Sequence, residues 1–326
     1  MKQLLSIAPG GPETLDLRES PDPVPGAGEV VVAMDFAALN FFDTLIIADR
    51  YQERPQRPFA PGGEGAGSII AVGEGIPASV LGMKVQVWCG HGALTTRLCL
   101  PFERCVPIPE GVSDEAAATL AIAYGTTLHA YCDKARLQEG ETVVVLGAAG
   151  GAGLAAVEIG KCLGARVIGV ASSDEKRALA KEHGADLTLE ADAESLKEAI
   201  RAATDGNGAD VVYDAVGGEL SEPAMRALAF GGRHLIIGFA SGTVPALRWN
   251  LALVKGIDLL GVHWGVAAAR NLAGHRAQME RLMAWVAEGR LTPHIDEIVP
   301  LEDAAEAIAR IRDRKARGKI LVDLAG

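Results

Sequence analysis

The stretch VLGAAGGAG, residues 145–153, constrains the fold of this chain more than any other segment. After its two apolar residues, the seven that follow are all glycine or alanine. So little side chain indicates either a tight backbone turn or a ligand that approaches bare peptide N–H groups, and the two are compatible. The apolar run 141–150 predicts a buried strand, and residues 153–164 predict a helix. The stretch therefore predicts the start of a βαβ unit.

Strands and helices continue to alternate beyond this turn. Residues 165–173 predict a second strand, and residues 174–184 predict a second helix. Helical stretches then separate three further short apolar strands, at 209–218, 232–242 and 258–265. Strands that alternate with helices in this way predict an α/β fold with a doubly wound parallel sheet.

The composition changes along the chain and predicts a second domain. Residues 1–118 are rich in glycine and proline and carry short apolar alternations, which are typical of a compact, largely β domain. Ser113 is the predicted N-cap of the helix that leads into the alternating part, residues 119–265. Residues 266–326 are predicted to be helical as far as residue 310 and to end in the strand GKILVDLAG, which returns to the first domain.

Charge and cysteine content exclude several classes of function. The 42 acidic residues exceed the 31 basic ones and give a net charge of −11, so nucleic acid is not an expected partner. The five cysteines form no C-x-x-C pair and are expected to be free thiols in a reducing cytoplasm. We expect no secretory signal at the N-terminus. The most apolar stretch, 142–160, contains five glycines and Glu158, so no membrane span is expected.

The glycine turn has the spacing of a dinucleotide-binding loop. Ala148, Gly150 and Gly153 form an A-x-G-x-x-G pattern, with alanine in place of the usual first glycine. Gly153 would let the helix pack close to the strand. The N–H groups and the dipole at the start of the helix would favour the charge of a pyrophosphate. The pyrophosphate is expected to contact the backbone of Ala149, Gly150, Gly151 and Ala152.

The end of the second strand decides which dinucleotide is expected. An acidic residue there would bind the ribose 2′-hydroxyl of NAD, but the chain has Ala171 at that position. Hydroxyls and cations suit the 2′-phosphate of NADPH instead, and Asp174 is expected to cap the next helix. The sequence therefore predicts NADPH as the cofactor, with its 2′-phosphate bound by Ser172, Ser173, Lys176 and Arg177.

Further motifs are distributed over nearly the whole chain. They include ALNFFDTLI (38–46), PFAPGGEGAGSIIAVGEGI (58–76), YGTTLHAY (124–131), ADVVYDAVGG (209–218) and GKILV (318–322). Together with the glycine turn they resemble the medium-chain dehydrogenase/reductase superfamily, and within it the zinc-free quinone oxidoreductase (zeta-crystallin-like) branch. The resemblance implies a GroES-like β-barrel catalytic domain, formed by 1–118 and 266–326, and an inserted Rossmann domain, formed by 119–265. It also implies a cleft between the domains and a homodimer in which the strand DLLGVHWG pairs with its copy.

The resemblance also bears on metal binding. Zinc alcohol dehydrogenases of this superfamily take a Cys ligand from the segment that aligns with Asn40, and a His ligand from a G-H-E motif. This chain reads NFFD at 40–43 and GGEG at 62–65, so neither ligand is present. His91 and Glu64 are too few for zinc, which needs three or four ligands. No metal is expected.

The resemblance also implies which residues lie near the nicotinamide and the substrate. Asn40 matches a position by the nicotinamide, where it could contact the nicotinamide ribose or the substrate. Asp43 would order the loop, and a turn-forming role stays open for both. Tyr51 matches a tyrosine that faces the substrate, although a packing role stays open for it too. Thr127 matches a threonine at the nicotinamide end, while Tyr124 and His129 are expected to pack in the core. Cofactor contacts are also expected from Val216, Gly217, Phe239, Ala240 and Ser241, because their loops follow the carboxyl ends of parallel strands. The resemblance implies further contacts for Asn250 and Lys319, while the role of a solvated charge stays open for Lys319.

These expectations define a reaction class. Without a metal, the chain must polarise its substrate by hydrogen bonds, which suits quinones and α,β-unsaturated carbonyls. The expected function is an NADPH-dependent reductase of such small molecules. One alternative is an enoyl-CoA reductase, in which Arg50, Arg54 and Arg57 would meet the phosphates of CoA. Another is a non-catalytic NADPH-binding protein of the crystallin kind.

Overall fold

The computed structural model describes residues 1–325, except for the side chain of Trp249. The chain divides into two compact units. We call the first the antiparallel unit; it comprises Met1–Ala123, Ala268–Gly289 and Pro293–Gly326. We call the second the parallel unit; it comprises Tyr124–Ala267 and Arg290–Thr292. The names refer to the main sheet of each unit.

The antiparallel unit is built around its long strand β3 (Glu29–Leu39). β3 pairs antiparallel with β4 (Glu64–Val72), β6 (Arg97–Pro101) and β15 (Lys319–Asp323). Through its pairing with β3, strand β15 joins the last residues of the chain to the sheet of this unit. The other strands are β5 (Lys84–Trp88), β7 (Cys105–Pro107) and β14 (Ile295–Pro300) in the same sheet, and the separate pair β1 (Lys2–Ser6) and β2 (Leu15–Glu19).

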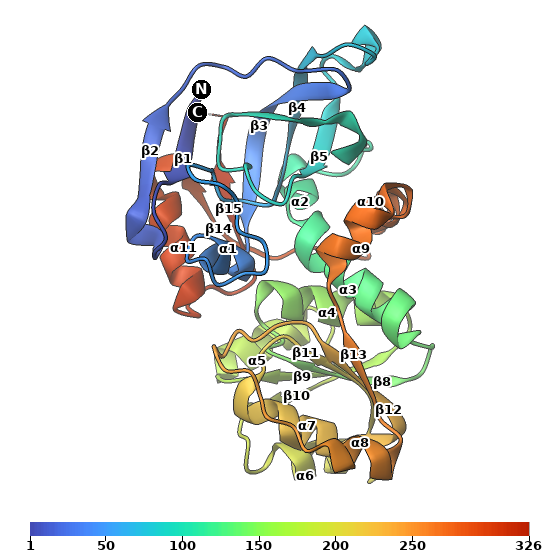
Figure 1. Ribbon diagram of the computed structural model, residues 1–326. Helices are drawn as coiled ribbons and strands as arrows, with labels where there is room; N and C mark the ends of the chain where they lie inside the picture. Colours follow the sequence, from blue (N-terminus) through green and yellow to red (C-terminus); the bar gives the residue numbers. More distant parts are fainter. Residues whose placement is uncertain (326) are drawn as a thin grey trace. The chain divides into compact units, whose positions relative to one another are not determined.

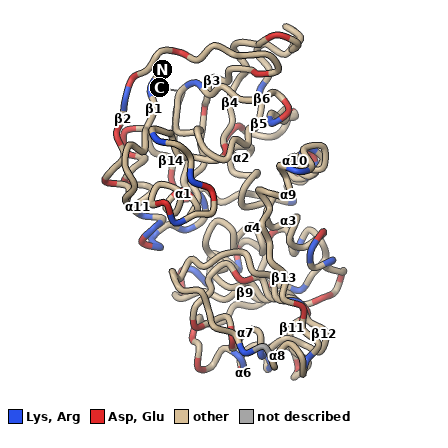
Figure 2. Tube along the Cα trace, in the orientation of Figure 1, with Lys and Arg blue, Asp and Glu red and all other residues tan. Residues whose placement is uncertain are grey.

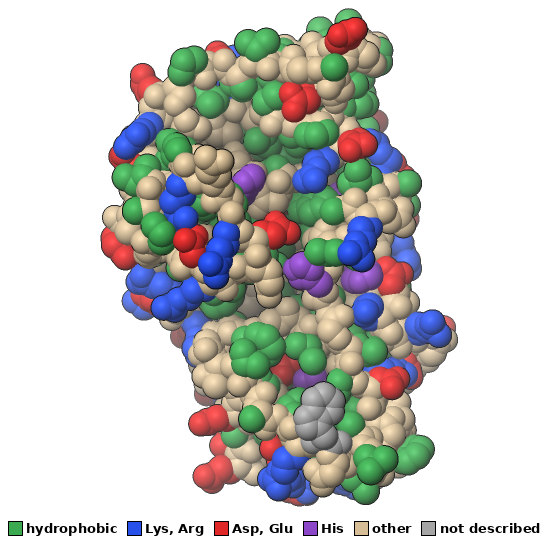
Figure 3. Space-filling model, in the orientation of Figure 1, with side chains coloured by type: hydrophobic (Ala, Val, Ile, Leu, Met, Phe, Trp, Pro, Cys, Tyr) green, Lys and Arg blue, Asp and Glu red, His purple; other side chains and the backbone are tan. Residues whose placement is uncertain are grey.

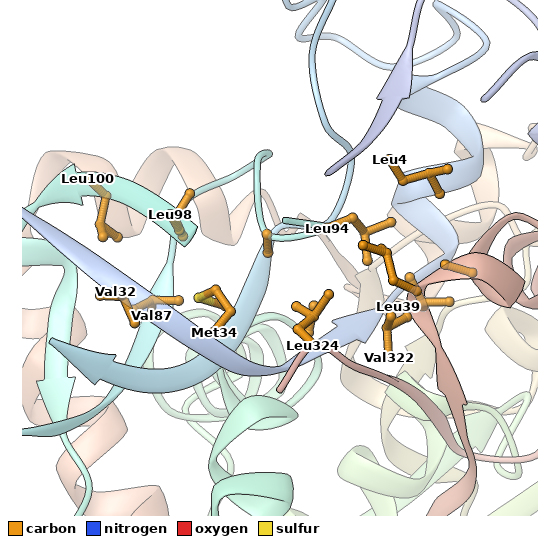
Figure 4. Close-up of a cluster of buried hydrophobic side chains, with 14 of the residues drawn as sticks. Leu4, Val32, Met34, Leu39, Val87, Leu94, Leu98, Leu100, Val322 and Leu324 are labelled. Atoms are coloured by element: carbon orange, nitrogen blue, oxygen red, sulfur yellow. The ribbon is translucent and has the colours of Figure 1, made fainter. Parts of the chain in front are cut away.

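The strands of this unit enclose an apolar core, part of which Figure 4 shows. Val30, Val32 and Met34 of β3 belong to this core, and Val31 between them is buried as well. Residues from both ends of the chain, Leu4, Val322 and Leu324, contribute to the same core together with Val87 and Leu98.

Four helices accompany the antiparallel sheet. α2 (Asp114–Ala118) is capped by Ser113, whose Oγ accepts the N–H of Ala116 at 3.2 Å, so the predicted cap is confirmed. A π-helix, Leu120–Tyr124, follows α2 at the point where the chain leaves this unit. The other helices are α1 (Phe41–Ile46), α10 (Leu272–Ala287) and α11 (Ala304–Arg312), of which α1 and α11 contact each other.

The parallel unit contains six strands in the order β10-β9-β8-β11-β12-β13, and all their pairings are parallel. This order reverses between β8 and β11, which makes their carboxyl ends the expected place for a ligand. The predicted doubly wound sheet is therefore confirmed. The strands are β8 (Thr142–Leu146), β9 (Arg166–Ala171), β10 (Leu187–Glu190), β11 (Ala209–Asp214), β12 (Leu228–Ile236) and β13 (Asp258–Gly261).

Helices cover both faces of this sheet (Figure 1). On one face, α6 (Leu196–Ala203) and α7 (Ser221–Arg226) pack on apolar side chains of β8 and β9. On the other face lies α4 (Gly151–Cys162), beside α3 (Gly125–His129). The remaining helices are α5 (Asp174–Glu182), α8 (Trp249–Lys255) and α9 (Trp264–Arg270).

Two sequence-based expectations are wrong. Residues 266–310 are not helical throughout, because β14 lies within them. Its sequence IDEIVP has little apolar alternation, and its pairing with β15 joins distant segments, so no local pattern shows it. The cap of α5 is Ser173, whose Oγ accepts the N–H of Lys176, and Asp174 is the first helical residue.

Candidate functional site

The glycine turn holds α4 close to the end of β8. The N–H groups of Gly147 and Ala148 both donate to the carbonyl of Val170, at 3.0 Å each. Gly147 has a φ of +75°, a conformation that favours glycine. A Cβ on Gly153 would lie 2.0 Å from the carbonyl oxygen of Gly147, so glycine alone fits at that position. The packing role predicted for Gly153 is confirmed.

The start of α4 offers backbone donors that the helix cannot pair. Gly150 is the N-cap and has no side chain to cover them, and the helix begins at Gly151. The first N–H groups of a helix have no acceptor within it, and they form the positive end of its dipole. They lie at the point where the strand order of the sheet reverses. The residues of this turn therefore fit the pyrophosphate of a dinucleotide.

The end of β9 carries hydroxyls and cations at the position that selects the dinucleotide. The strand ends at Ala171, and Ser172 and Ser173 follow it with exposed side chains. Arg177 donates to the carbonyl of Ala171 at 3.2 Å and pairs with Asp174, which holds it against the strand end. Lys176 lies in the first turn of α5 and is half-buried. These residues fit a 2′-phosphate better than a bare 2′-hydroxyl.

The loops that follow β11 and β12 are joined to each other. The N–H of Ser241 donates to the carbonyl of Val216 at 2.8 Å. Gly217 has a φ of +69°, and a Cβ there would lie 2.7 Å from the ring of Phe239. The structure thus brings together the predicted residues Val216, Gly217, Phe239, Ala240 and Ser241.

Asp214 organises the first of these loops, and the sequence analysis missed it. Its Oδ1 accepts the N–H groups of Val216 and Gly217, at 3.0 and 2.8 Å. Its Oδ2 accepts the hydroxyl of Ser221 and lies 3.2 Å from Nε2 of His234. Burial acts to raise the pKa of Asp214, but these hydrogen bonds outweigh burial and lower it. The available signal was an acid at the end of a parallel strand, just before Val-Gly-Gly.

Residues 124–129, where the chain enters the parallel unit, lie mostly inside that unit. Thr127 is fully buried, and its hydroxyl lies 2.9 Å from that of Tyr213, so its contact with a nicotinamide stays a prediction. Tyr124 is buried as expected. His129 is largely buried, with 15% of its side chain exposed, and it pairs with Asp133 on the next helical turn.

A buried carboxylate on α4 links two other elements of the parallel unit. Oε2 of Glu158 accepts the hydroxyl of Tyr124 at 2.8 Å, and its Oε1 lies 2.6 Å from Nδ1 of His183. This hydrogen bond raises the pKa of His183 above its ordinary value of 6.5, although burial opposes the shift. Protonated His183 therefore ties the end of α5 to the middle of α4.

We expect this pair to make stability depend on pH. Because the folded-state pKa of His183 lies above the unfolded value of 6.5, its contribution is complete below pH 6.5. It is lost as the pH rises through the raised pKa. The side chains of His183 and Glu158 are exposed by only 11% and 5%, so salt should screen the pair little and the loss should be measurable. Urea unfolding of the wild type and of His183→Gln at pH 6 and pH 8.5 measures it, and equal losses in both proteins would contradict the assignment.

In the antiparallel unit, three side chains far apart in the sequence meet. Nζ of Lys319 donates to Oδ1 of Asn40 at 2.6 Å and to Oε1 of Glu64 at 2.8 Å. Nδ2 of Asn40 donates to the same oxygen of Glu64 at 2.8 Å. Lys319 and Glu64 have side chains exposed by 3% and 0%. The alternative of Lys319 as a solvated charge is therefore wrong, and Glu64 is a second residue that the sequence analysis missed.

The loop of Asn40 is held by Asp43, as the resemblance implied. Oδ2 of Asp43 accepts the N–H of Asn40 at 2.8 Å, and its Oδ1 accepts the N–H of Gly62 at 3.0 Å. Burial raises the pKa of Asp43 to about 7, against the opposing effect of the two N–H groups and of Lys319. One carboxyl group therefore orders the two segments that carry Asn40 and Glu64.

This geometry does not fit a zinc ion. Asn40 and Glu64 already hold the ammonium group of Lys319, and Gly63 offers no side chain. Burial raises the pKa of the nearby Cys89 thiol to about 12, which disfavours a thiolate ligand. Within residues 1–325, no three His, Cys, Asp or Glu side chains lie together as a metal site would need.

Tyr51 is half-buried and packs edge-on against Phe42, with ring centroids 5.2 Å apart. Burial raises the pKa of its phenol, so the hydroxyl keeps its proton at neutral pH. Of the arginines near it, Arg57 donates to the carbonyl of Ile47 at 2.8 Å and pairs with Asp49. Arg57 is thus part of the local structure and does not fit the implied role in binding CoA, whereas Arg50 and Arg54 are exposed.

Charged side chains of both signs are distributed along both units (Figure 2). On the face drawn in Figure 3, basic and acidic side chains are interspersed. No helix in the described part of the chain is long and apolar enough to cross a membrane. Asn250 is exposed near the start of α8, and its implied contact with the cofactor stays a prediction.

Comparisons with known proteins agree with this picture. Residues 26–111 match the family model for the alcohol dehydrogenase GroES-like domain, and residues 151–288 match the model for zinc-binding dehydrogenases. Quinone oxidoreductase-like protein 2 of Bos taurus is 36% identical over 297 residues, which are 91% of this chain and 85% of that protein. The quinone oxidoreductase of Pseudomonas aeruginosa is 31% identical over 322 residues, 98% of this chain and 99% of that one.

The fold has close counterparts among solved structures. The Escherichia coli quinone oxidoreductase, complexed with NADPH, matches with a TM-score of 0.91 and 26% identity, over 99% of this chain and 100% of that one. The predicted combination of a GroES-like domain and a Rossmann domain is confirmed. The chain therefore belongs to the medium-chain dehydrogenase/reductase superfamily, in its quinone oxidoreductase branch.

Proposed function

We propose that this protein is a zinc-independent, NADPH-dependent reductase that transfers hydride to a quinone or an α,β-unsaturated carbonyl. The observation that carries the proposal is the glycine turn at the switch point of the sheet, next to a β9 end that has hydroxyls and cations in place of an acid. The Escherichia coli relative was solved with NADPH, which supports the same cofactor here.

The residues of the parallel unit have distinct tasks in this proposal. The N–H groups of residues 149–152 hold the pyrophosphate, and Ser172, Ser173 and Lys176 hold the 2′-phosphate. The joined loops at 216–217 and 239–241, which Asp214 shapes, would support the nicotinamide end. When bound, the reduced nicotinamide supplies the hydride.

We expect Lys176→Ala to weaken NADPH binding about 10-fold and to leave NADH binding unchanged, because only NADPH has the 2′-phosphate. Fluorescence titration with both cofactors measures this. Lys181→Ala is the matched control, since it removes the same charge from an exposed position farther along α5. Equal losses of affinity for the two cofactors would refute the assignment of the 2′-phosphate site.

Tyr51 is the proposed donor to the developing oxyanion of the substrate. Its raised pKa keeps the proton available, and replacing it by phenylalanine preserves the packing on Phe42. We expect Tyr51→Phe to lower kcat about 100-fold without changing stability or the affinity for NADPH. Steady-state kinetics and a cofactor titration separate these effects. An unchanged kcat would remove Tyr51 from the mechanism.

An acceptor panel tests the function as a whole. NADPH oxidation is measured with a simple quinone, a short enone and crotonyl-CoA, before and after dialysis against EDTA. The proposal expects turnover with the quinone or the enone, unaffected by EDTA. Turnover with crotonyl-CoA alone would favour the enoyl-CoA alternative. Loss of activity on EDTA treatment with recovery on adding Zn²⁺ would refute zinc independence, and no turnover with any acceptor would refute the enzyme.

We also propose a homodimer formed through the parallel unit. β13 is the outer strand of its sheet, with one edge unpaired among the described strands. The same unit exposes Phe230 and Leu253 by 85% each and Val254 by 68%, which is unusual for large apolar side chains. The mass of the protein in solution, from light scattering, tests the proposal. A cytoplasmic location stays a prediction.

A further inference from the structure

We propose that Glu64 and Lys319 are positioning residues that fix the direction of the Asn40 side-chain amide, so that Asn40 meets a ligand only as a hydrogen-bond acceptor. The inference about the amide itself rests on the apo structure. The inference about which ligand group it meets rests on the proposed function.

The neighbours of Asn40 allow one orientation of its amide. An ammonium group has only donors, and a carboxylate has only acceptors. Oδ1 of Asn40 lies 2.6 Å from Nζ of Lys319, and Nδ2 lies 2.8 Å from Oε1 of Glu64. If the amide were turned over, its NH₂ would face the ammonium and its oxygen would face the carboxylate. The charges of the pair therefore exclude the reversed orientation.

In this orientation both amide hydrogens are used within the protein. One is donated to Glu64 and the other to the carbonyl of Ala38, at 3.1 Å. Oδ1 has two lone pairs, and Lys319 takes one of them. The N–H of Asp43 faces this side chain in the capping box of α1, but it is donated to the backbone carbonyl of Asn40 at 3.0 Å. Asn40 keeps part of its surface exposed. What it can offer to a ligand is the second lone pair of Oδ1.

The network is anchored so that the amide cannot easily rotate. Oε2 of Glu64 accepts the N–H of Ile122 at 2.8 Å, a donor that belongs to the π-helix at the end of α2. The backbone N–H of Asn40 is bonded to Asp43. Lys319 and Glu64 are buried, so water does not compete for their hydrogen bonds.

This result limits the part that Asn40 can play. The oxygen of a quinone or an enone has no hydrogen to donate, so Asn40 cannot polarise it. The partner of Asn40 must be a donor. In NADPH the donors at the nicotinamide end are the ribose hydroxyls and the carboxamide NH₂. Asn40 is thereby assigned to the cofactor and not to the substrate.

The first test needs no cofactor. It measures how fast the side-chain NH₂ protons of Asn40 exchange with water in ¹⁵N-labelled protein without cofactor. The signal of these protons is assigned by its loss in Asn40→Ala. We expect them to exchange at least about 100-fold more slowly than the NH₂ protons of an exposed asparagine. The double variant Glu64→Gln/Lys319→Met removes both charges together, so no buried ion is left unpaired, and should lose most of this protection. Lys319→Arg keeps the donors and should retain it.

A matched control removes an ion pair elsewhere. Glu141→Gln/Arg233→Met eliminates the pair between Arg233 and Glu141, 2.6 Å apart in the parallel unit, and should leave the exchange of Asn40 unchanged. Fast exchange of the Asn40 protons in the wild type, or the same protection in wild type and Glu64→Gln/Lys319→Met, would overturn the proposal.

The second test measures NADPH affinity. We expect Asn40→Ala to weaken binding about 10-fold, and Glu64→Gln/Lys319→Met to do so by a similar factor. The triple variant should bind no more weakly than Asn40→Ala, because all three residues act through one amide. Additive losses in the triple variant would overturn the positioning role.

The two possible donors, the carboxamide NH₂ and a ribose hydroxyl, are distinguished with the reduced 3-acetylpyridine analogue of NADPH. In this analogue a methyl group replaces the carboxamide NH₂. If the effect of Asn40→Ala disappears with this analogue, the donor is the carboxamide; if it persists, the donor is a ribose hydroxyl. A wild type that binds no NADPH would refute the proposed function, and the exchange experiment would still decide the direction of the amide.

Discussion

The variant Gly153→Ala is expected to lose NADPH binding by at least about 100-fold and stability by about 3 kcal/mol. A Cβ at this position would lie 2.0 Å from the carbonyl oxygen of Gly147 and 2.8 Å from Cα of Ala148. Both atoms belong to the backbone of the turn, so no side-chain rotation can relieve the overlap. α4 must then move away from β8, and the N–H groups at its start move with it. Urea unfolding and a fluorescence titration measure the two effects.

Variants at two other glycines distinguish an effect of steric strain on folding from an effect on contact with the ligand. A Cβ on Gly150 would meet the carbonyl oxygen of Gly147 at 3.6 Å, an ordinary contact, so Gly150→Ala should fold normally but hinder the approach of a pyrophosphate. Gly261 has nothing within 4 Å of an added Cβ, so Gly261→Ala should change neither property. If Gly153→Ala bound NADPH like the wild type, the geometry assigned to the turn would be wrong.

The variant Lys319→Met is expected to lose about 3–5 kcal/mol of unfolding free energy, because it leaves the carboxylate of Glu64 buried without its cation. The hydrogen bonds from Asn40 and Ile122 satisfy the oxygens of Glu64 but do not neutralise its charge. Adding Glu64→Gln to this variant should recover much of the loss. Urea unfolding at constant pH measures each change.

The control for this experiment is an exposed lysine. Lys2 pairs with Glu302 at 3.3 Å, and about half of each side chain is exposed. Lys2→Met should therefore change stability by less than about 1 kcal/mol. If Lys319→Met were as stable as Lys2→Met, the pair of Lys319 and Glu64 could not be the buried ion pair that the structure shows.

Features that depend on neighbouring residues were predictable from the sequence. The glycine turn, the strands and helices around it and the cap at Ser113 follow from local periodicity and from the conformational freedom of glycine. The hydroxyls and cations at the end of β9 lie within six residues of one another, at 172–177, so the NADPH hypothesis needed no tertiary information.

The failed expectation for residues 266–310 concerns a contact between distant segments. β14 is a strand because β15 pairs with it, and its own residues have little strand pattern. Asp214 was missed for a different reason, because its bonds to the N–H groups of Val216 and Gly217 are local and only its contact with His234 needs the neighbouring strand β12. The pairing of β14 with β15 leaves no local trace in the sequence, whereas the acid before Val-Gly-Gly was a usable signal for Asp214.

The sequence by itself determined the family and the parallel sheet and predicted where the dinucleotide binds, because each motif behind them consists of residues that are close together in the chain. Only the tertiary structure showed that Lys319 and Glu64 form a buried ion pair in the antiparallel unit. Asn40 and Lys319 are 279 residues apart, and they meet because β15 pairs with β3. Their burial with Glu64 turns an ordinary lysine into an internal cation, and that burial is a property of the packed sheet rather than of any segment.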